Sequence, residues 1–229
     1  MKKILCVFLS AMLMLGFSGC GSLNNAAKGG LIGGGGGAAL GAGIGALIGK
    51  GKGAAIGGAI GAVAGGVAGT LIGKKMDKQA RELAEITGAQ VDTCTDVNGF
   101  KAIRVTFESG ILFGFNSSKL DDKAKASLDK FATSLINNPQ TEVQIYGHTD
   151  NVGSRAANEK VSNARANEVK SYLTNAGVPG ARLSSQGLAY DYPVASNDSE
   201  AGRAQNRRVE IYITANEDMI KAAQDGTLK

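Results

Sequence analysis

Two hydrophobic periods divide the second half of the chain. Apolar and polar side chains alternate over residues 101–107 and 142–146, which is the period of a strand with one buried face. A further strand is expected before residue 98, because Asn98-Gly99 is a strong hairpin turn signal. The pattern also favours strands at three more places, residues 111–116, 183–187 and 207–214.

Two amphipathic helices separate these strands. The first has apolar residues at helical spacing from Leu120 to Leu135, with Ser118 as its expected N-cap. The second covers residues 155–176, with Ser154 as N-cap and Gly177 after its last turn. The order after the initial hairpin is β-α-β-α-β-β, so the predicted fold class is α+β.

The most informative stretch lies where the strand at 142–146 leads into the second helix. Asp150 follows the strand, and Arg165 occupies the core-facing stripe of the helix together with Asn158 and Ser162. A guanidinium in that position needs an anionic partner, because an unpaired buried charge is costly. The residues predict a dipolar pocket for a ligand that carries an ammonium and a carboxylate. A fold-internal ion pair between Asp150 and Arg165 fits the spacing equally well.

Composition argues against several other functions. The formal net charge of +5 falls to +3 if Lys2 and Lys3 are removed with a signal peptide, and no basic cluster with interleaved aromatics occurs, so we expect no nucleic-acid partner. A single histidine, His148, and three cysteines without a C-x-x-C pair predict no metal and no cofactor. No nucleophile elbow is present. We therefore predict that the protein is not an enzyme and that His148 is a strand-end hydrogen-bonding residue.

Glycine occupies every fourth position from residue 29 to residue 73. In a helix this spacing leaves one smooth face on which another backbone can pack, as in lipid-embedded helices. Residues 31–49 and 53–73 carry no charge, and each is ~30 Å long as a helix, which matches a hydrocarbon core. We predict a membrane-associated glycine-zipper hairpin over residues 29–75. A soluble hairpin that pairs with other copies, a disordered tether, and an oligomeric channel or membrane-remodelling element remain alternatives.

The first 19 residues have the basic start and short apolar run of an export signal. The junction FSGC resembles a bacterial lipobox, which implies cleavage before Cys20 and lipid attachment to it, with residues 20–28 as a lipidated tether. Residues 76–99 are the expected connector, of which residues 76–89 are polar, helical in character and expected to protrude into solvent, and residues 216–229 are expected to form a frayed tail. Cys94 is either a shielded small residue or the partner in an intermolecular disulfide.

Several separated motifs carry a resemblance to a known family. They are GHTDNVGSRAANEKVSNARANEVKSYL, GVPGARLSSQGLAYDYPVASN and GRAQNRRVEIYI. In order and spacing they resemble the periplasmic peptidoglycan-binding domain of the OmpA family, over about half of the chain. The resemblance implies a mixed sheet with helices on one face, here over residues 100–215, and non-covalent binding of the diaminopimelate of peptidoglycan stem peptides.

The resemblance also implies which residues bind. Asp150 would accept from the ligand ammonium, and Arg165 would form a bidentate pair with its carboxylate. The neighbouring family positions match Phe115, Asn116, Thr149, Asn158, Val161, Asn206 and Arg207. For Arg207 an equally strong interpretation is a brace on the last strand. The expectation is a lipid-anchored outer-membrane protein with its C-terminal domain in the periplasm, whose partners are peptidoglycan, outer-membrane lipid and, through the zipper, further copies of itself.

Overall fold

The computed structural model describes residues 66–96, 98–114 and 117–228. Several predictions fall outside these residues and stay predictions. They concern the signal peptide, lipidation of Cys20, the tether, the glycine zipper up to residue 65, and the positions of Phe115 and Asn116.

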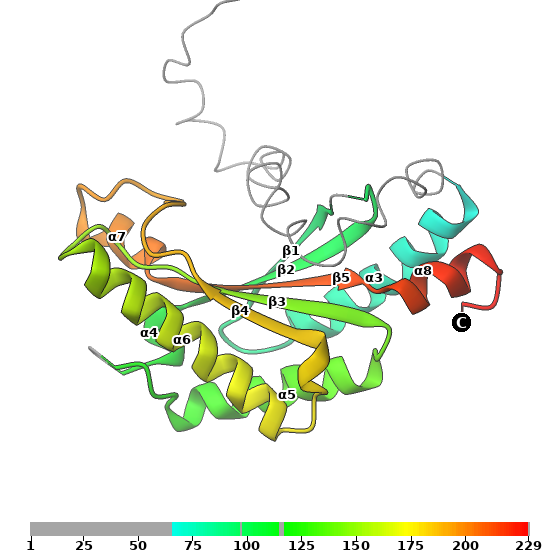
Figure 1. Ribbon diagram of the computed structural model, residues 1–229, viewed down its shortest axis with the longest axis horizontal. Coiled ribbons are helices and arrows are strands. Elements are labelled where there is room, and N and C mark those ends of the chain that lie inside the picture. The colour runs from blue at the N-terminus through cyan, green and yellow to red at the C-terminus, as the bar shows by residue number, and fades with distance from the viewer. Residues whose placement is uncertain (1–65, 97, 115–116, 229) are drawn as a thin grey trace, which may run out of the picture. The chain divides into compact units, whose positions relative to one another are not determined.

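A mixed five-stranded sheet forms the centre of the described part (Figure 1). The strand order is β1-β2-β5-β3-β4, in which β3 and β4 are parallel and the other neighbours are antiparallel. The strands are β1 (Gln90–Thr95), β2 (Lys101–Glu108), β3 (Thr141–Gly147), β4 (Leu183–Gly187) and β5 (Arg208–Ala215). With the intervening helices this confirms the predicted α+β class and the mixed sheet.

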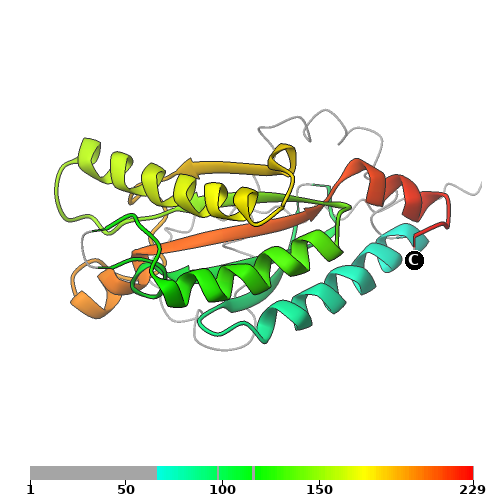
Figure 2. The ribbon, with the colours of Figure 1, turned by 90° about the horizontal axis from the view of Figure 1, so that it is seen from below.

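Three long helices cover one face of the sheet (Figure 2). They are α3 (Val67–Ala84), α5 (Asp122–Asn137) and α6 (Arg155–Asn175). The hydrophobic core lies between them and the sheet, and Phe107 of β2 meets Phe131 of α5 edge-on with ring centroids 6.4 Å apart. The shorter helices are α4 (Ser109–Leu112), η3 (Gly180–Arg182), α7 (Glu200–Asn206) and α8 (Glu217–Gln224).

The predicted hairpin is present. Gly99 has a φ of +82°, a left-handed conformation that glycine adopts without steric cost. Asp96 closes the turn, because its carboxylate accepts from the backbone amides of Asn98 and Phe100, each at 2.9 Å. Local turn chemistry therefore fixes the connection between β1 and β2.

The strand predicted at residues 111–116 is wrong where the structure describes it. The chain forms α4 up to Leu112, and Phe113 makes only an isolated bridge with Leu120. Both Leu112 and Phe113 are buried in the core, so the described part of this apolar run packs into the interior without joining a strand of the sheet. The cap of α5 also differs, because Asp121, not Ser118, accepts from the amide of Ala124 at 2.7 Å.

The prediction that the connector protrudes into solvent is wrong for its helical part. Residues 76–84 belong to α3, whose buried face continues through Ile72, Met76 and Leu83, all fully inaccessible. Because α3 begins at Val67, the last part of the predicted second zipper arm belongs to this packed helix. The rest of that arm lies outside the described residues and stays a prediction. Among the described residues, no helix combines the length and the apolar content of a membrane span.

The prediction that residues 216–229 form a frayed tail is also wrong. Residues 217–224 form α8, which Asn216 caps by accepting from the amide of Met219 at 2.9 Å. Met219 and Ile220 are buried in the core, and α8 packs beside α3 (Figure 2). The two ends of the described chain therefore close the core together.

Candidate functional site

Two glycines bring α6 close to the ends of two parallel strands. A Cβ on Gly147 would lie 2.2 Å from the backbone oxygen of Ser162, and one on Gly187 would lie 2.3 Å from the backbone nitrogen of Asn163. No other residue fits there without moving the helix. This close packing places the buried face of α6, with Asn158, Ser162 and Arg165, against the end of the sheet, and confirms that these side chains share one face.

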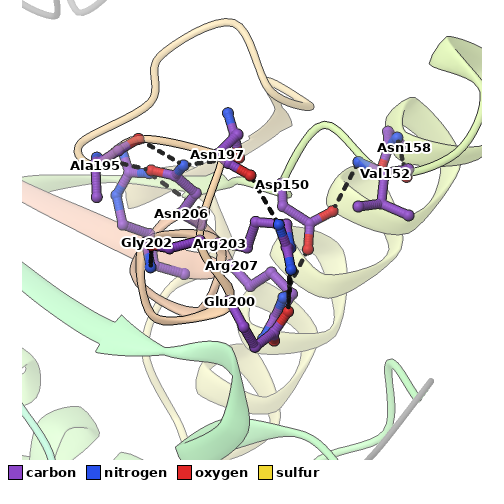
Figure 3. A network of polar contacts seen from close by, with 12 residues as sticks. Asp150, Val152, Asn158, Ala195, Asn197, Glu200, Gly202, Arg203, Asn206 and Arg207 are labelled. Carbon is purple, nitrogen blue, oxygen red and sulfur yellow. Dashed lines mark hydrogen bonds and ion pairs between the residues drawn. The ribbon is translucent and has the colours of Figure 1, made fainter.

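Asp150 lies in the loop between β3 and α6. Its Oδ1 accepts from the amide of Val152 at 3.0 Å, and its Oδ2 accepts from Nη1 of Arg207 at 2.7 Å (Figure 3). Asn158 fixes the same loop, because its amide donates to the carbonyl of Val152 at 2.9 Å and to that of Ser154 at 3.2 Å. The carboxylate is therefore held in one position, with 11% of the side chain exposed.

Arg207 continues the charged contacts onto α7. Its Nη2 donates to Oε1 of Glu200 at 2.6 Å, and Arg203 reaches the other oxygen of Glu200, with Nη2 at 2.9 Å (Figure 3). The hydrogen bond that Arg207 donates to Asp150 is the main cause that raises the pKa of Arg207 above its usual range. The hydrogen bond from Arg207 holds the pKa of Glu200 below its usual range.

Arg165 is buried and, within the described part of the chain, makes no ion pair with a carboxylate. Its Nε and Nη2 donate to the carbonyl of Ser117, each at 3.2 Å, and its guanidinium carbon lies 5.2 Å from the ring centroid of Phe113. Burial lowers its pKa, the positive charge of Arg207 lowers it further, and Asp150 opposes the shift. The predicted internal ion pair with Asp150 is therefore not formed among the described residues, and the site keeps a cation without an acidic partner.

Asn206 holds the loop before α7 in place. Its Oδ1 accepts from the amides of Val194 and Ala195 at 2.8 and 3.0 Å, and its Nδ2 donates to the carbonyl of Ala195 and to Oδ1 of Asn197, both at 2.9 Å (Figure 3). Because Asn206 is fully buried, its side chain braces the backbone that carries Arg207.

A second polar cluster lies beneath the Asp150 loop, on the sheet face opposite the helices. Arg208 donates to Glu210 at 2.7 Å, and the hydroxyl of Tyr212 donates to Glu210 at 2.9 Å. His148 lies beside them with 1% of its surface exposed, its Nε2 3.7 Å from Oε2 of Glu210. Burial, reinforced by Arg208, lowers the pKa of His148 to about 3, while Glu210 opposes the shift. Neither ring nitrogen has a hydrogen-bond partner in the described part of the chain, so the predicted hydrogen-bonding role of the His148 side chain is not found there.

The structure brings most of the predicted site residues to one end of the sheet. The hydrogen-bonded network contains Asp150, Asn158, Asn206 and Arg207. Arg165 interacts electrostatically with Asp150 and Arg207. Two more predicted residues are described: Thr149, whose buried hydroxyl has no hydrogen-bond partner in the described part, and Val161, half-buried on α6. Phe115 and Asn116 lie outside the described residues.

Sequence reasoning missed three contributors, Phe113, Ser117 and Glu200. Glu200 had a detectable signal, because Arg203 and Arg207 follow it at spacings of three and seven, which share one helix face. The contacts of Phe113 and Ser117 with Arg165 span about fifty residues of sequence, and local pattern does not reveal them.

Comparison with known proteins gives the family context. The OmpA family profile matches residues 112–207, and the YMGG-like Gly-zipper profile matches residues 1–77. Outer membrane protein Omp38 of Acinetobacter baumannii is 43% identical over 117 residues, 51% of this chain and 33% of Omp38. The outer-membrane lipoprotein YfiB of Pseudomonas aeruginosa is 39% identical over 107 residues, 47% of this chain and 64% of YfiB. The lipoprotein YiaD of Escherichia coli K12 is 35% identical over 146 residues, 62% of this chain and 64% of YiaD.

Solved structures share the fold. A MotB-like protein from Desulfovibrio vulgaris has a TM-score of 0.56 at 26% identity, over 66% of this chain and 97% of that one. The T6SS cell wall anchor from Pseudomonas aeruginosa has a TM-score of 0.52 at 28% identity, over 62% and 97%. The chain spans between 33% and 64% of the length of the three curated relatives above. Residues 112–207 of the chain therefore match the OmpA family.

Proposed function

We propose that this protein is an outer-membrane lipoprotein that binds peptidoglycan non-covalently and tethers the outer membrane to the cell wall. Two relatives support the proposal by their names, since YfiB is an outer-membrane lipoprotein and the T6SS relative is a cell wall anchor. The lipobox-like junction before Cys20 supplies the membrane attachment, and the OmpA-family domain supplies the wall attachment. Two moderate attachments on one chain reinforce each other, because the second forms at high effective concentration.

The ligand we propose is the diaminopimelate of the stem peptide. One observation carries this assignment, the buried guanidinium of Arg165 that has no acidic partner in the described residues and lies near Asp150. A ligand carboxylate would pair with Arg165, and the neighbouring ammonium would bind to Asp150. The carboxylate and the ammonium of the ligand would then each form an ion pair with a protein group that is already held in place.

The remaining predicted residues would complete the site. Thr149 offers a buried hydroxyl without a partner in the described part, and Asn158 fixes the Asp150 loop. Val161 lies one helical turn before Arg165 on α6. Four further residues follow from the family resemblance. Phe115 and Asn116 would contact the ligand, Arg207 would act through Asp150, and the fully buried Asn206 would brace the backbone that carries Arg207.

Titration of residues 66–229 with diaminopimelate, followed by backbone amide shifts, tests the assignment. The fragment starts at residue 66 because α3 is part of the core. We expect Arg165→Gln to weaken binding at least about tenfold, since a charge-assisted bidentate pair is lost. Arg182→Gln is the matched control, because Arg182 is another guanidinium held by backbone carbonyls, those of Leu135, Asn138 and Thr141.

Both arginine variants need their melting temperatures measured, so that a loss of fold is separated from a loss of binding. Saturable shifts around Asp150 and Arg165 that vanish in Arg165→Gln and persist in Arg182→Gln would support the ligand assignment. A folded wild-type fragment that shows no shifts, and does not sediment with isolated sacculi, would refute it.

The membrane attachment has its own test. We expect the full chain to incorporate a labelled fatty acid, and a Cys20→Ser variant to lose the label and keep its binding to sacculi. A wild-type chain without label, or a variant that keeps it, would contradict lipid anchoring at this residue.

A further inference from the structure

Arg207 is shared between two carboxylates from different elements. Its Nη1 contacts Asp150 of the β3–α6 loop at 2.7 Å, and its Nη2 contacts Glu200 of α7 at 2.6 Å (Figure 3). The exposed fraction of the side chain increases across these three ion-paired residues, from 11% for Asp150 to 34% for Arg207 and 67% for Glu200. The guanidinium therefore joins an enclosed carboxylate to one in solvent.

Both oxygens of Asp150 are already occupied, by the amide of Val152 and by Arg207. An ammonium that approaches Asp150 meets the positive charge of Arg207 at the same carboxylate. Arg165 adds a second positive charge nearby, and the two arginines repel each other. Loss of the Arg207–Asp150 contact would relieve this repulsion and free the carboxylate for the ligand.

The surroundings allow the side chain of Arg207 to move while its backbone stays in place. Its carbonyl accepts from the amide of Ser109 at 2.7 Å, and its amide donates to the carbonyl of Arg203 at 3.0 Å. Asn206, the residue before Arg207, is held in place by four hydrogen bonds of its own side chain. Glu200 holds Nη2 independently of Asp150, so the guanidinium keeps one ion pair when the other is broken.

We propose that Arg207 is a latch on the ammonium subsite and that Glu200 is the residue that receives it. This inference rests on the proposed function of the same site. Without ligand, Arg207 neutralises Asp150. When the ligand arrives, its ammonium takes the place of Nη1, and Arg207 is held by Glu200 alone. Glu200 is thus a positioning residue that determines how strongly the site favours a ligand with an ammonium.

The test compares two ligands that differ only in their ammonium groups, diaminopimelate and pimelate, the unsubstituted seven-carbon dicarboxylate. Dissociation constants are measured with the full chain in detergent, from amide shifts at Asp150 and Arg165. We expect Glu200→Gln to weaken diaminopimelate binding about threefold, the scale of an exposed ion pair, and to leave pimelate binding unchanged. Glu217→Gln is the matched control, because Glu217 is likewise an acidic residue in the first turn of a short helix.

A double-mutant cycle separates the latch from a simple field effect. In an Arg207→Gln background, Glu200→Gln should no longer change diaminopimelate binding, because no guanidinium remains to be received. If Glu200→Gln weakens diaminopimelate equally in both backgrounds, if it weakens both ligands alike, or if it weakens neither, the latch is refuted. A wild-type protein that binds no diaminopimelate would refute the proposed function as well, so the two failures are distinguishable.

Discussion

Replacing His148 with glutamine should remove most of the dependence of stability on pH between pH 7.5 and pH 5. His148 is the only histidine in the chain, so no other side chain with an ordinary pKa titrates in this interval. The imidazole is enclosed, and neither ring nitrogen has a hydrogen-bond partner in the described part. The charged groups that face it are Arg208 and Glu210, already paired with each other.

The sign follows from the direction of the shift. Burial, with Arg208, lowers the pKa of His148 from 6.5 to about 3, so the unfolded chain takes up a proton before the folded chain does. The contribution of the neutral imidazole to stability is complete above the unfolded pKa and is lost as the pH falls toward the folded one. From pH 7.5 to pH 5 the loss is about 2 kcal/mol, and this figure requires only that the folded pKa lie below ~4.

Urea unfolding followed by far-UV circular dichroism at pH 7.5, 6 and 5 measures the effect on residues 66–229. We expect the wild type to lose about 2 kcal/mol across this range and His148→Gln to lose less than about 0.5 kcal/mol, whatever the absolute stability of the variant. Carboxylates with lowered pKa, such as Glu210, add their losses nearer pH 4. Parallel losses in the two proteins, or an imidazole proton resonance of the folded protein that titrates near pH 6, would refute the reasoning.

Three further predictions concern the packing of the helices and the loop before α7. Ile72→Ala should lower the free energy of unfolding by about 2–4 kcal/mol in urea titrations, because the side chain is fully buried in α3. Val67→Ala, at a position that is 77% exposed, should change it little. Gly187→Ala should lower the melting temperature by several degrees, because a Cβ there lies 2.3 Å from the backbone of α6, whereas Gly110→Ala meets no atom within 4 Å and should be tolerated. Asn206→Ala should cost about 2–4 kcal/mol and speed hydrogen exchange at the two amides it accepts from, and unchanged exchange there would contradict its bracing role.

Where the strand alternation or the helical spacing of apolar residues was continuous, the predicted elements agree well with the structure. The helices at residues 122–137 and 155–175 and the strands at 141–147 and 183–187 lie within one or two residues of their predicted bounds. Ser154 is the cap of α6 as expected. The apolar run at residues 111–116 failed because a short continuous run does not by itself distinguish a strand from a buried helical turn.

Helix α3 was predicted in two separate pieces, and its continuity and its burial were missed because its pattern crosses a boundary in composition. Ala68, Ile72, Met76, Ala80 and Leu83 form one buried stripe at helical spacing, but the glycine repeat ends at residue 73 and the polar segment begins at residue 76. Because the chain was divided by composition, each segment contained only part of the buried stripe, and neither part was recognised as the core-facing side of one helix. The last helix was overlooked because it has only two turns, although its Asn cap and acidic first turn were visible.

At the site, the residue types were predictable and their pairing was not. Asp150 and Arg165 were expected to satisfy each other or a ligand, yet Asp150 pairs with Arg207, 57 positions along the chain. That contact exists because β5 and β3 are antiparallel neighbours, so the start of β5 lies beside the end of β3. Such non-local pairing depends on sheet order, which local periodicity does not determine.

The packing of α3 also bears on how the two proposed attachments work together. A flexible linker would let the folded domain rotate freely about its N-terminal end, whereas a helix with Ile72 and Met76 in the core fixes the direction in which the chain leaves the domain. Under the proposed function, tension between membrane and wall passes through α3 into the core it shares with β2, α5 and α8.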